Sequence, residues 1–369
     1  MTVLRRLPWD LVALLVLAGL PLVPGLFEGL QRELNLPFGS ELTTLFIMAV
    51  LGLGLHVVVG YVGLLSLGVA AFFGIGAYVT GILTVPGLPF QVSFPVSLVV
   101  ATLTAAFVGL LLAAPTLRLR GDYLALVTLG FGEVTRFAIK NLEEITNGSK
   151  GLNPIPPPKL PGLDGNWAGD FRYFYYLCLA CLFVVLVALR NIEKSRLGRA
   201  WIAVREDELA ATCMGLNVPR LKLAAFALGA GLAGLAGCLY ATKLGNTASP
   251  EAFGFNRSVT VLCCLILGGL GNRSGVLLGV LLVVGFDNIL APVLDKYLQA
   301  RRQMLAKPGE STAVIDYETF TFWKLMVFGL ALILVMRFRP EGLLPSSRMK
   351  RELHPDEDVP AAVQPAPGA

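Results

Sequence analysis

Long apolar runs alternate with short polar segments along most of the chain. A helix needs roughly 20 apolar residues to cross the hydrocarbon core of a bilayer, so each run of about that length predicts a membrane span. Ten candidate spans emerge, which are residues 8–27, 42–60, 61–85, 95–115, 121–139, 171–189, 222–242, 258–271, 274–290 and 321–336. Residues 42–85 contain no charge, and 258–271 is short for a complete crossing. The pattern therefore predicts eight to ten spans.

The composition of the 369-residue chain agrees with a polytopic membrane protein. Hydrophobic residues make up 55% and charged residues 15%, against roughly 45–50% and 25% in globular proteins, and the mean hydropathy is +0.70. This composition argues against a soluble enzyme, and we expect an all-α transmembrane helical bundle. With 40 glycines, the bundle should be tightly packed and include broken or re-entrant segments, for which residues 60–81 are the candidate.

Charge predicts how the chain is oriented. The net charge of +5 is better explained by membrane topology than by nucleic-acid binding. Seven lysines and arginines lie between residues 190 and 222, which places this loop in the cytoplasm. An even number of spans then puts both termini there. Arg5 and Arg6 precede the first run without a convincing cleavage site after it, so we interpret residues 8–27 as a retained span.

The predicted organisation is one transmembrane domain, residues 1–345, followed by a short tail. Outer loops are expected at residues 140–170, which should be irregular and surface-exposed, and at 291–320. The tail, residues 346–369, mixes both charges with an Ala/Pro-rich stretch and cannot bury enough apolar surface to fold, so we expect disorder.

Enzymatic signatures are nearly absent. No phosphate-binding loop occurs, and His56 and His354 are too few to form a metal site with the cysteines, so we expect neither metal nor cofactor. Cys178 and Cys181 have the spacing of redox and zinc sites but lie in an apolar run, which favours buried core residues. An intramembrane enzyme would need a polar catalytic cluster that the sequence does not offer.

The segment from Gly229 to Gly234 matches the dinucleotide-binding fingerprint letter for letter. Its context is an apolar helix with no preceding strand and no acidic residue at the expected distance. Small residues instead recur every four positions, as in Ala230 and Gly234, which favours close approach of two membrane helices.

Few ionisable residues lie inside the predicted spans, and such residues are candidate functional positions. Glu133 and Arg136 are three residues apart, and we expect either a local salt bridge or the lining of a solute path. Asp287 is interpreted as an interfacial anchor, and His56 as a packed neutral imidazole.

The most informative segment is residues 195–215 in the cytoplasmic loop. It is predicted to be helical up to Met214, to end at Gly215 and to resume as a span after Pro219. An apolar stripe should contain Leu197, Trp201, Val204 and Leu209. The outward-facing residues should be Arg199, Arg205, Glu206, Asp207 and Glu208. Two interpretations stay open, a helix on the membrane surface or a helix that docks into a groove on a partner.

Five short segments of this chain carry a resemblance to a known family. They are residues 198–215, 120–133, 249–253, 267–271 and 339–345. In their order along the chain they resemble the LivM-type permease subunits of branched-chain amino-acid ABC importers, and the similarity covers roughly residues 42–345. The family pattern Glu-Ala-Ala-x-x-x-Gly is matched by Ala210, Ala211 and Gly215, but Glu208 stands one position early and the segment 297–320 has no assignment.

The resemblance implies a transport subunit of the bacterial cytoplasmic membrane that moves branched-chain or other hydrophobic amino acids by alternating access. It implies a second permease subunit, two ATPase subunits that supply ATP hydrolysis, and an extracytoplasmic amino-acid-binding protein. The implied ATPase-docking residues are Arg196, Gly198, Arg199, Trp201, Arg205, Glu206, Asp207, Glu208, Ala211 and Gly215. As pore candidates we take Gly63, Gly74, Gly76, Glu133 and Arg136, because broken helices expose backbone groups that can bind a zwitterion. The alternatives are a urea or short-chain amide importer of the same superfamily, and an ATP-independent channel or facilitator.

Overall fold

The structure is a computed structural model that describes residues 37–86, 91–116, 122–158, 171–269 and 271–293, with the single positions 17, 19, 21, 326, 329, 330, 333, 337 and 342–344. The predicted spans 8–27 and 321–336, the segment 297–320 and the tail 346–369 lie outside the continuous ranges.

All the described elements are helices. The long helices are α3 (Phe38–His56), α4 (Val69–Thr84), α5 (Phe94–Thr116), α6 (Asp122–Asn141), α8 (Phe171–Lys194), α11 (Val218–Leu244), α12 (Phe255–Gly268) and α13 (Arg273–Gly285). The short ones are η3 (Val57–Tyr61), α7 (Glu143–Thr146), η4 (Gly148–Lys150), α9 (Arg196–Glu206), α10 (Glu208–Cys213), η5 (Pro250–Phe253) and η6 (Phe286–Leu290).

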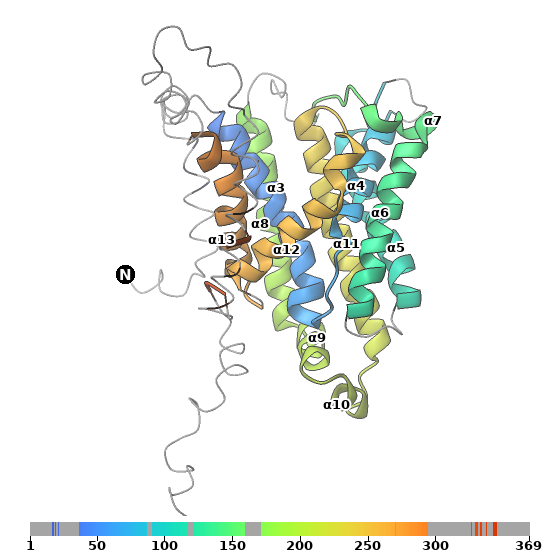
Figure 1. Cartoon of the computed structure of the whole chain (residues 1–369), viewed down its shortest axis with the longest axis vertical. Helices are drawn as coiled ribbons and strands as arrows, with labels where there is room; N and C mark the ends of the chain where they lie inside the picture. The colour runs from blue at the N-terminus through green and yellow to red at the C-terminus, as the bar shows by residue number, and fades with distance from the viewer. Residues whose placement is uncertain are drawn as a thin grey trace, which may run out of the picture.

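The long helices run side by side and form one bundle (Figure 1). Among the described residues, six helical segments are long and apolar enough to cross a membrane, and α4 is a shorter apolar helix. Each of the eight predicted spans between residues 42 and 290 overlaps one long helix, but α4 covers only part of the predicted span 61–85, and α6 is not among the six. The predicted all-α membrane bundle is confirmed. The pair α9–α10 lies at one end of the bundle and α7 at the other (Figure 1).

Helix α11 packs against α3, α4 and α5 through its small residues. A Cβ atom at Gly229 would lie 2.8 Å from the carbonyl oxygen of Gly54 on α3. A Cβ atom at Gly76 on α4 would fall on the backbone of Gly234. The Gly229–Gly234 segment therefore serves helix packing, as its four-residue spacing predicts.

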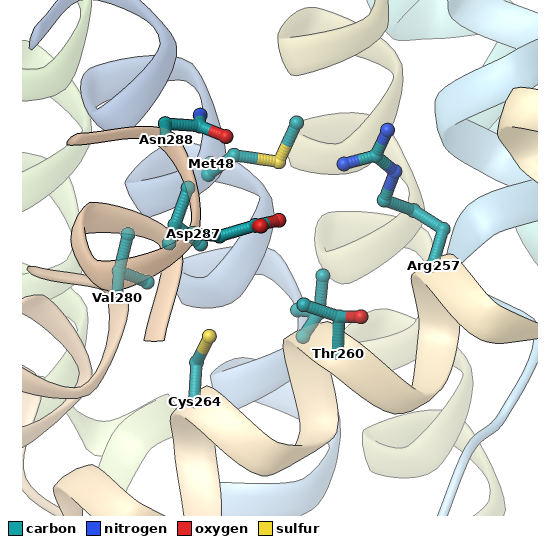
Figure 2. Close-up of a pocket in the computed structure, with 9 residues that line it drawn as sticks. Met48, Arg257, Thr260, Cys264, Val280, Asp287 and Asn288 are labelled. Atoms are coloured by element: carbon teal, nitrogen blue, oxygen red, sulfur yellow. The ribbon is translucent and has the colours of Figure 1, made fainter. Parts of the chain in front are cut away.

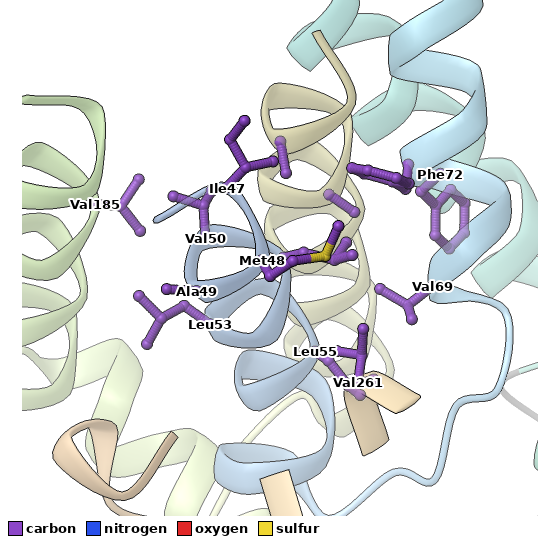
Figure 3. Close-up of a cluster of buried hydrophobic side chains, with 14 of the residues drawn as sticks. Ile47, Met48, Ala49, Val50, Leu53, Leu55, Val69, Phe72, Val185 and Val261 are labelled. Carbon is purple, nitrogen blue, oxygen red and sulfur yellow. The ribbon is translucent and has the colours of Figure 1, made fainter. Parts of the chain in front are cut away.

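Helix α3 forms the centre of the apolar core. Ile47, Val50 and Leu51 are fully buried, and the surrounding side chains come from α4, α8 and α12 (Figure 3). By contrast, α5 and α6 direct large apolar side chains such as Phe107 and Leu126 outward. Such outward apolar faces are typical of helices that meet lipid or another membrane subunit.

Residues 63–68, between η3 and α4, are not helical, so the predicted broken segment 60–81 is confirmed in its first part, whereas residues 69–81 belong to the continuous helix α4. Helix α3 continues into the π-helical turn η3, and Gly63 then adopts a positive φ of 78°. The expected span 61–85 is interrupted after Val62 and becomes helical again at Val69, since residues 63–68 run upward in an irregular path (Figure 3). Two side chains satisfy its backbone, since Leu67 N–H donates to Thr128 Oγ1 at 3.0 Å and Ala70 N–H donates to Ser258 Oγ at 3.1 Å.

The loop after α6 is irregular, but the expectation that it is surface-exposed is wrong for part of it. Leu152 and Ile155 are buried. The reason is backbone pairing with the end of α11, because Ile155 N–H donates to Gly245 O at 2.7 Å and Thr247 N–H to Leu152 O at 3.1 Å.

Two distant segments meet beyond the end of α12. Leu343 N–H donates to Leu267 O at 3.1 Å, and Leu344 N–H donates to Gly268 O at 3.0 Å. These carbonyl groups belong to the last turn of α12 and have no partner within the helix. Residues 342–344 therefore complete the end of α12.

Candidate functional site

The segment 195–215 forms two helices, α9 and α10, so the prediction of one helix up to Met214 is wrong. Asp207 adopts an extended conformation, and its Oδ1 accepts hydrogen bonds from the N–H groups of Leu209 at 2.8 Å and Ala210 at 3.0 Å. Asp207 thus ends α9 and caps α10. The predicted end at Gly215 is confirmed by a φ of 82°, and α11 begins at Val218.

Three of the expected docking residues are buried against this chain. Trp201 is fully buried, and its Nε1–H donates to the carbonyl oxygen of Leu221 on α11 at 2.8 Å. Its ring stacks with Tyr61 of η3, with 6.3 Å between centroids. Gly198 and Ala211 are also buried. These residues attach α9 and α10 to the bundle, and their side chains do not reach the surface.

Arg205 faces the bundle, which corrects the expectation that it points outward. Its Nη1 donates to Gly60 O at 2.6 Å, and a Cβ atom at Gly63 would lie 3.0 Å from its Cγ. The cause is the irregular end of α3, whose last carbonyl groups lack helical partners. Glu208 is likewise engaged, because its Oε1 accepts from Lys222 Nζ at 2.8 Å. Arg205 therefore connects α9 to the broken segment.

The surface left free on α9 and α10 is mixed in character. Leu209 was expected in the apolar stripe, but the turn at Asp207 rotates it outward, and it is 68% exposed. Met214 is 84% exposed, and Ala210 is exposed beside it. We call Leu209, Ala210 and Met214 the α10 tip. Arg196, Arg199 and Glu206 lie exposed on the neighbouring α9 and surround these apolar groups with charge.

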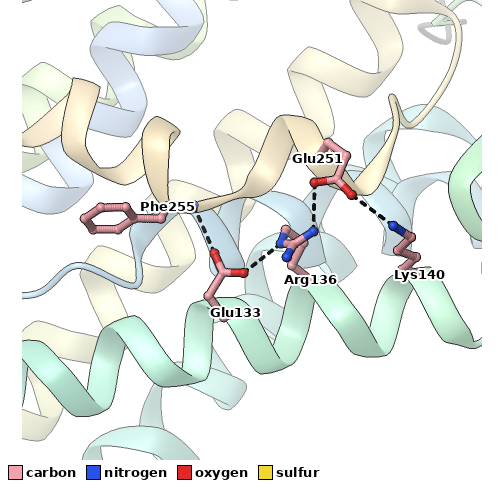
Figure 4. Close-up of polar contacts among 5 residues, drawn as sticks. All are labelled: Glu133, Arg136, Lys140, Glu251 and Phe255. Carbon is pink, nitrogen blue, oxygen red and sulfur yellow. Dashed lines mark hydrogen bonds and ion pairs between the residues drawn. The ribbon is translucent and has the colours of Figure 1, made fainter.

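In the half of α6 that leads toward α7, the predicted pair of Glu133 and Arg136 is confirmed and belongs to a larger cluster (Figure 4). Arg136 Nε donates to Glu133 Oε2 at 2.8 Å, and its Nη1 donates to Glu251 Oε2 at 2.7 Å. Lys140 Nζ lies 3.2 Å from Glu251 Oε1, and Phe255 N–H donates to Glu133 Oε1 at 3.3 Å. The outer charge cluster, defined as Glu133, Arg136, Lys140 and Glu251, thereby holds η5 and the start of α12 against α6.

Replacement of Arg136 with methionine is expected to release α12 from α6. Each charge-assisted bond contributes roughly 1.5–3 kcal/mol when sheltered, and less where it involves the 60% exposed Glu251. The amino-acid uptake that the family resemblance implies should fall about tenfold or more. The matched control is Lys140→Met, which removes an exposed bond to the same Glu251 and should change uptake little. Equal uptake by both variants would contradict this role of Arg136.

The glycine pore candidates occupy three different environments. Gly63 is exposed in the broken segment beside Arg205, whereas Gly74 and Gly76 are buried on α4. A Cβ atom at Gly74 would lie 3.0 Å from the ring of Phe253. Gly74 and Gly76 therefore provide close packing in this structure, and their part in a solute path stays a prediction.

His56 is buried at the end of α3, as a packed imidazole should be. Its ring meets Tyr61 edge to face, with 4.7 Å between centroids. With Trp201 these rings form a continuous aromatic contact from α3 to α9.

Comparison with known proteins identifies the family. The model of the family described as branched-chain amino acid transport system / permease component matches residues 39–336. The chain is 38% identical over 335 residues to the high-affinity branched-chain amino acid transport system permease protein LivM of Escherichia coli K12, covering 85% of this chain and 71% of that protein.

More distant relatives agree. A probable branched-chain amino acid transport permease protein LivM of Methanocaldococcus jannaschii is 25% identical, over 87% of this chain and 91% of that protein. The autoinducer 2 import system permease protein LsrC of an Enterobacter species is 26% identical over 61% of this chain and 63% of that protein. No solved structure gives a significant match. The helical membrane bundle and the match over most of its length lead to one conclusion: the chain belongs to the permease family of branched-chain amino acid transport systems.

Proposed function

We propose that this chain is the permease subunit of an ATP-driven importer that carries branched-chain or other hydrophobic amino acids across the bacterial cytoplasmic membrane. The observation that carries the proposal is the α9–α10 pair, which protrudes from one end of the bundle and presents the apolar α10 tip among charged side chains. Such a surface suits docking into a groove on a partner protein, with apolar anchors for affinity and charges for register.

The attachment of α9 suggests how docking acts on the bundle. Arg205 bonds to Gly60 at the end of α3, and Trp201 bonds to Leu221 on α11. A displacement of α9 by the partner is therefore transferred to the two helices at the centre of the bundle. This is the coupling that alternating access requires, since both helices pack against α4.

Each partner expected for such an importer can be assigned to one surface of the bundle. Two ATPase subunits would dock on the end that carries α9 and α10 and supply the ATP hydrolysis. An extracytoplasmic amino-acid-binding protein would meet the opposite end, near the outer charge cluster. A second permease subunit and membrane lipid would cover the outward apolar faces of α5 and α6.

The orientation is supported by charge. The seven basic residues between 190 and 222 lie at the end of the bundle formed by α9 and α10, which the positive-inside rule assigns to the cytoplasm. With ten spans, both termini would lie on that side.

Replacement of Leu209 with glutamate tests the docking surface. The Leu209 side chain is exposed, so a charge there should leave the fold intact but disfavour burial in an apolar groove. We expect the ATPase subunits that co-purify from native membranes to fall about tenfold. The measurement is the mass-spectrometric ratio of ATPase to permease.

The matched control is Leu142→Glu, a substitution of an exposed leucine at the other end of the bundle. It should leave the recovery of ATPase unchanged. If the wild-type chain brings down no ATPase while the bundle stays folded, the ATP-driven proposal fails. Passive solute flux through vesicles that contain this chain alone would then support a facilitator.

A further inference from the structure

A small cavity lies between α3, α12 and η6, the π-helical continuation of α13, and its walls differ in chemistry (Figure 2). Arg257, Thr260, Asp287 and Asn288 line one part of it. The remaining lining is apolar and includes Met48 and Val280. The cavity therefore combines a positive side chain, Arg257, and a negative one, Asp287, with an aliphatic wall.

Arg257 is the unusual member of this lining. It is half-buried, its Nε donates to Ala252 O at 3.4 Å, and its guanidinium lies 6.0 Å from the ring of Tyr240. Among the ion pairs of the described residues, none involves Arg257. A cation inside a membrane bundle is costly without an anionic partner, so this position favours the binding of an anion.

Asp287 and Asn288 face the same cavity from the opposite side (Figure 2). They lie on η6, where the helix changes from α to π. Single π-helical turns within α-helices occur frequently at functional sites. Asp287 lies near the end of a span, as expected for an anchor at the membrane interface. Its side chain, however, lines the cavity.

We propose that this cavity is a binding site for the zwitterionic group of the transported amino acid. Arg257 binds the carboxylate, Asp287 binds the ammonium group, and the aliphatic side chain lies against Met48 and Val280. This inference rests on the proposed transport function and adds the place where the transporter binds its solute.

The proposed site is closed in this structure. Its volume is about 20 Å³, which is enough for one water molecule and too small for an amino acid. The site must therefore widen when the transporter opens. Because Arg257 lies on α12 and Asp287 on the continuation of α13, a shift of either helix changes the distance between the two charges.

The test uses the complete transporter in proteoliposomes with its loaded binding protein and internal ATP. Arg257→Met should lower the uptake of labelled leucine at least tenfold, while size-exclusion chromatography shows an assembled complex. Arg257→Lys keeps the positive charge and should retain most of the uptake. Lys150→Met, which removes an exposed positive charge on η4 away from the cavity, should match the wild type.

A charge exchange separates solute recognition from a structural role. If Arg257 and Asp287 only stabilise each other across the cavity, the double variant Arg257→Asp/Asp287→Arg should restore both thermal stability and uptake. Our proposal expects restored stability with uptake still at least tenfold low, because the inverted charges turn the aliphatic side chain away from its wall.

Three outcomes would overturn the site, namely wild-type uptake by Arg257→Met, equal losses in Arg257→Met and Arg257→Lys, and restored uptake in the exchange variant. Failure of the wild-type transporter to accumulate leucine would instead refute the proposed function.

Discussion

Replacement of Gly237 with alanine is expected to prevent α11 from closing against α4. A Cβ atom at this position would fall on the carbonyl oxygen of Phe73 and lie 2.9 Å from the backbone nitrogen of Ala77. The colliding atoms belong to backbone, so rotamer changes cannot relieve the collision. Overpacking of a core typically costs about 1–3 kcal/mol of folding free energy. The cost of Gly237→Ala should lie at or above the upper end of this range. The melting temperature of the purified chain in detergent should fall markedly, and most of the expressed protein should be lost.

Gly130→Ala is the matched control. It lies on α6 with nothing within 4 Å of the position that a Cβ atom would take. An alanine there should stabilise the helix by up to about 0.5–1 kcal/mol. The two substitutions make the same chemical change, so opposite shifts in melting temperature isolate the helix contact. An unchanged melting temperature for Gly237→Ala would show that α11 and α4 do not approach as closely as described.

Replacement of Trp201 with alanine should detach α9 and α10 from the bundle. Loss of a fully buried tryptophan costs on the order of 3–5 kcal/mol, here through its contact with Tyr61 and its bond to Leu221. Trp201 contacts the bundle at η3 and near the start of α11, so the remainder of the bundle should stay folded. We expect rapid proteolysis within residues 196–213 and at least a tenfold loss of co-purifying ATPase.

The graded control is Trp201→Phe, which keeps an aromatic ring beside Tyr61 but removes the Nε1–H donor. Its cost should be about 1 kcal/mol, with proteolysis and ATPase recovery between those of wild type and Trp201→Ala. If Trp201→Ala leaves both measurements unchanged, α9 is held by other contacts, and the proposed transfer of motion through Trp201 is wrong.

Hydrophobic pattern was sufficient to predict most of the fold. The spans depend on length and apolarity, which the chain shows directly, and the packing of α11 follows from the spacing of residues such as Gly229 and Gly234. The pair of Glu133 and Arg136 was predictable for the same reason, because partners three residues apart share one helix face.

Contacts between distant segments were not predictable in this way. Glu251 joins Arg136 across 115 positions, and Arg257 and Asp287 line one cavity only because two helices pack side by side. The inward orientation of Arg205 depends on a free carbonyl group at the end of α3, which periodicity does not reveal. The turn at Asp207 does have a local signal, since aspartate is a preferred N-cap, but the apolar periodicity from Leu197 to Leu209 favours one continuous helix.

The bonds from residues 342–344 to the end of α12 set an order of events during biosynthesis. Leu343 and Leu344 are synthesised about 75 residues after Leu267 and Gly268, the residues whose carbonyl groups they bond. At translation rates of about 5–20 residues per second, some 4–15 seconds pass before these partners exist. During that interval the nascent chain carries an unfinished helix end. A chain whose translation stops before residue 342 keeps these unpaired carbonyl groups at the end of α12. The unfinished helix end therefore distinguishes an aborted product from a completed one.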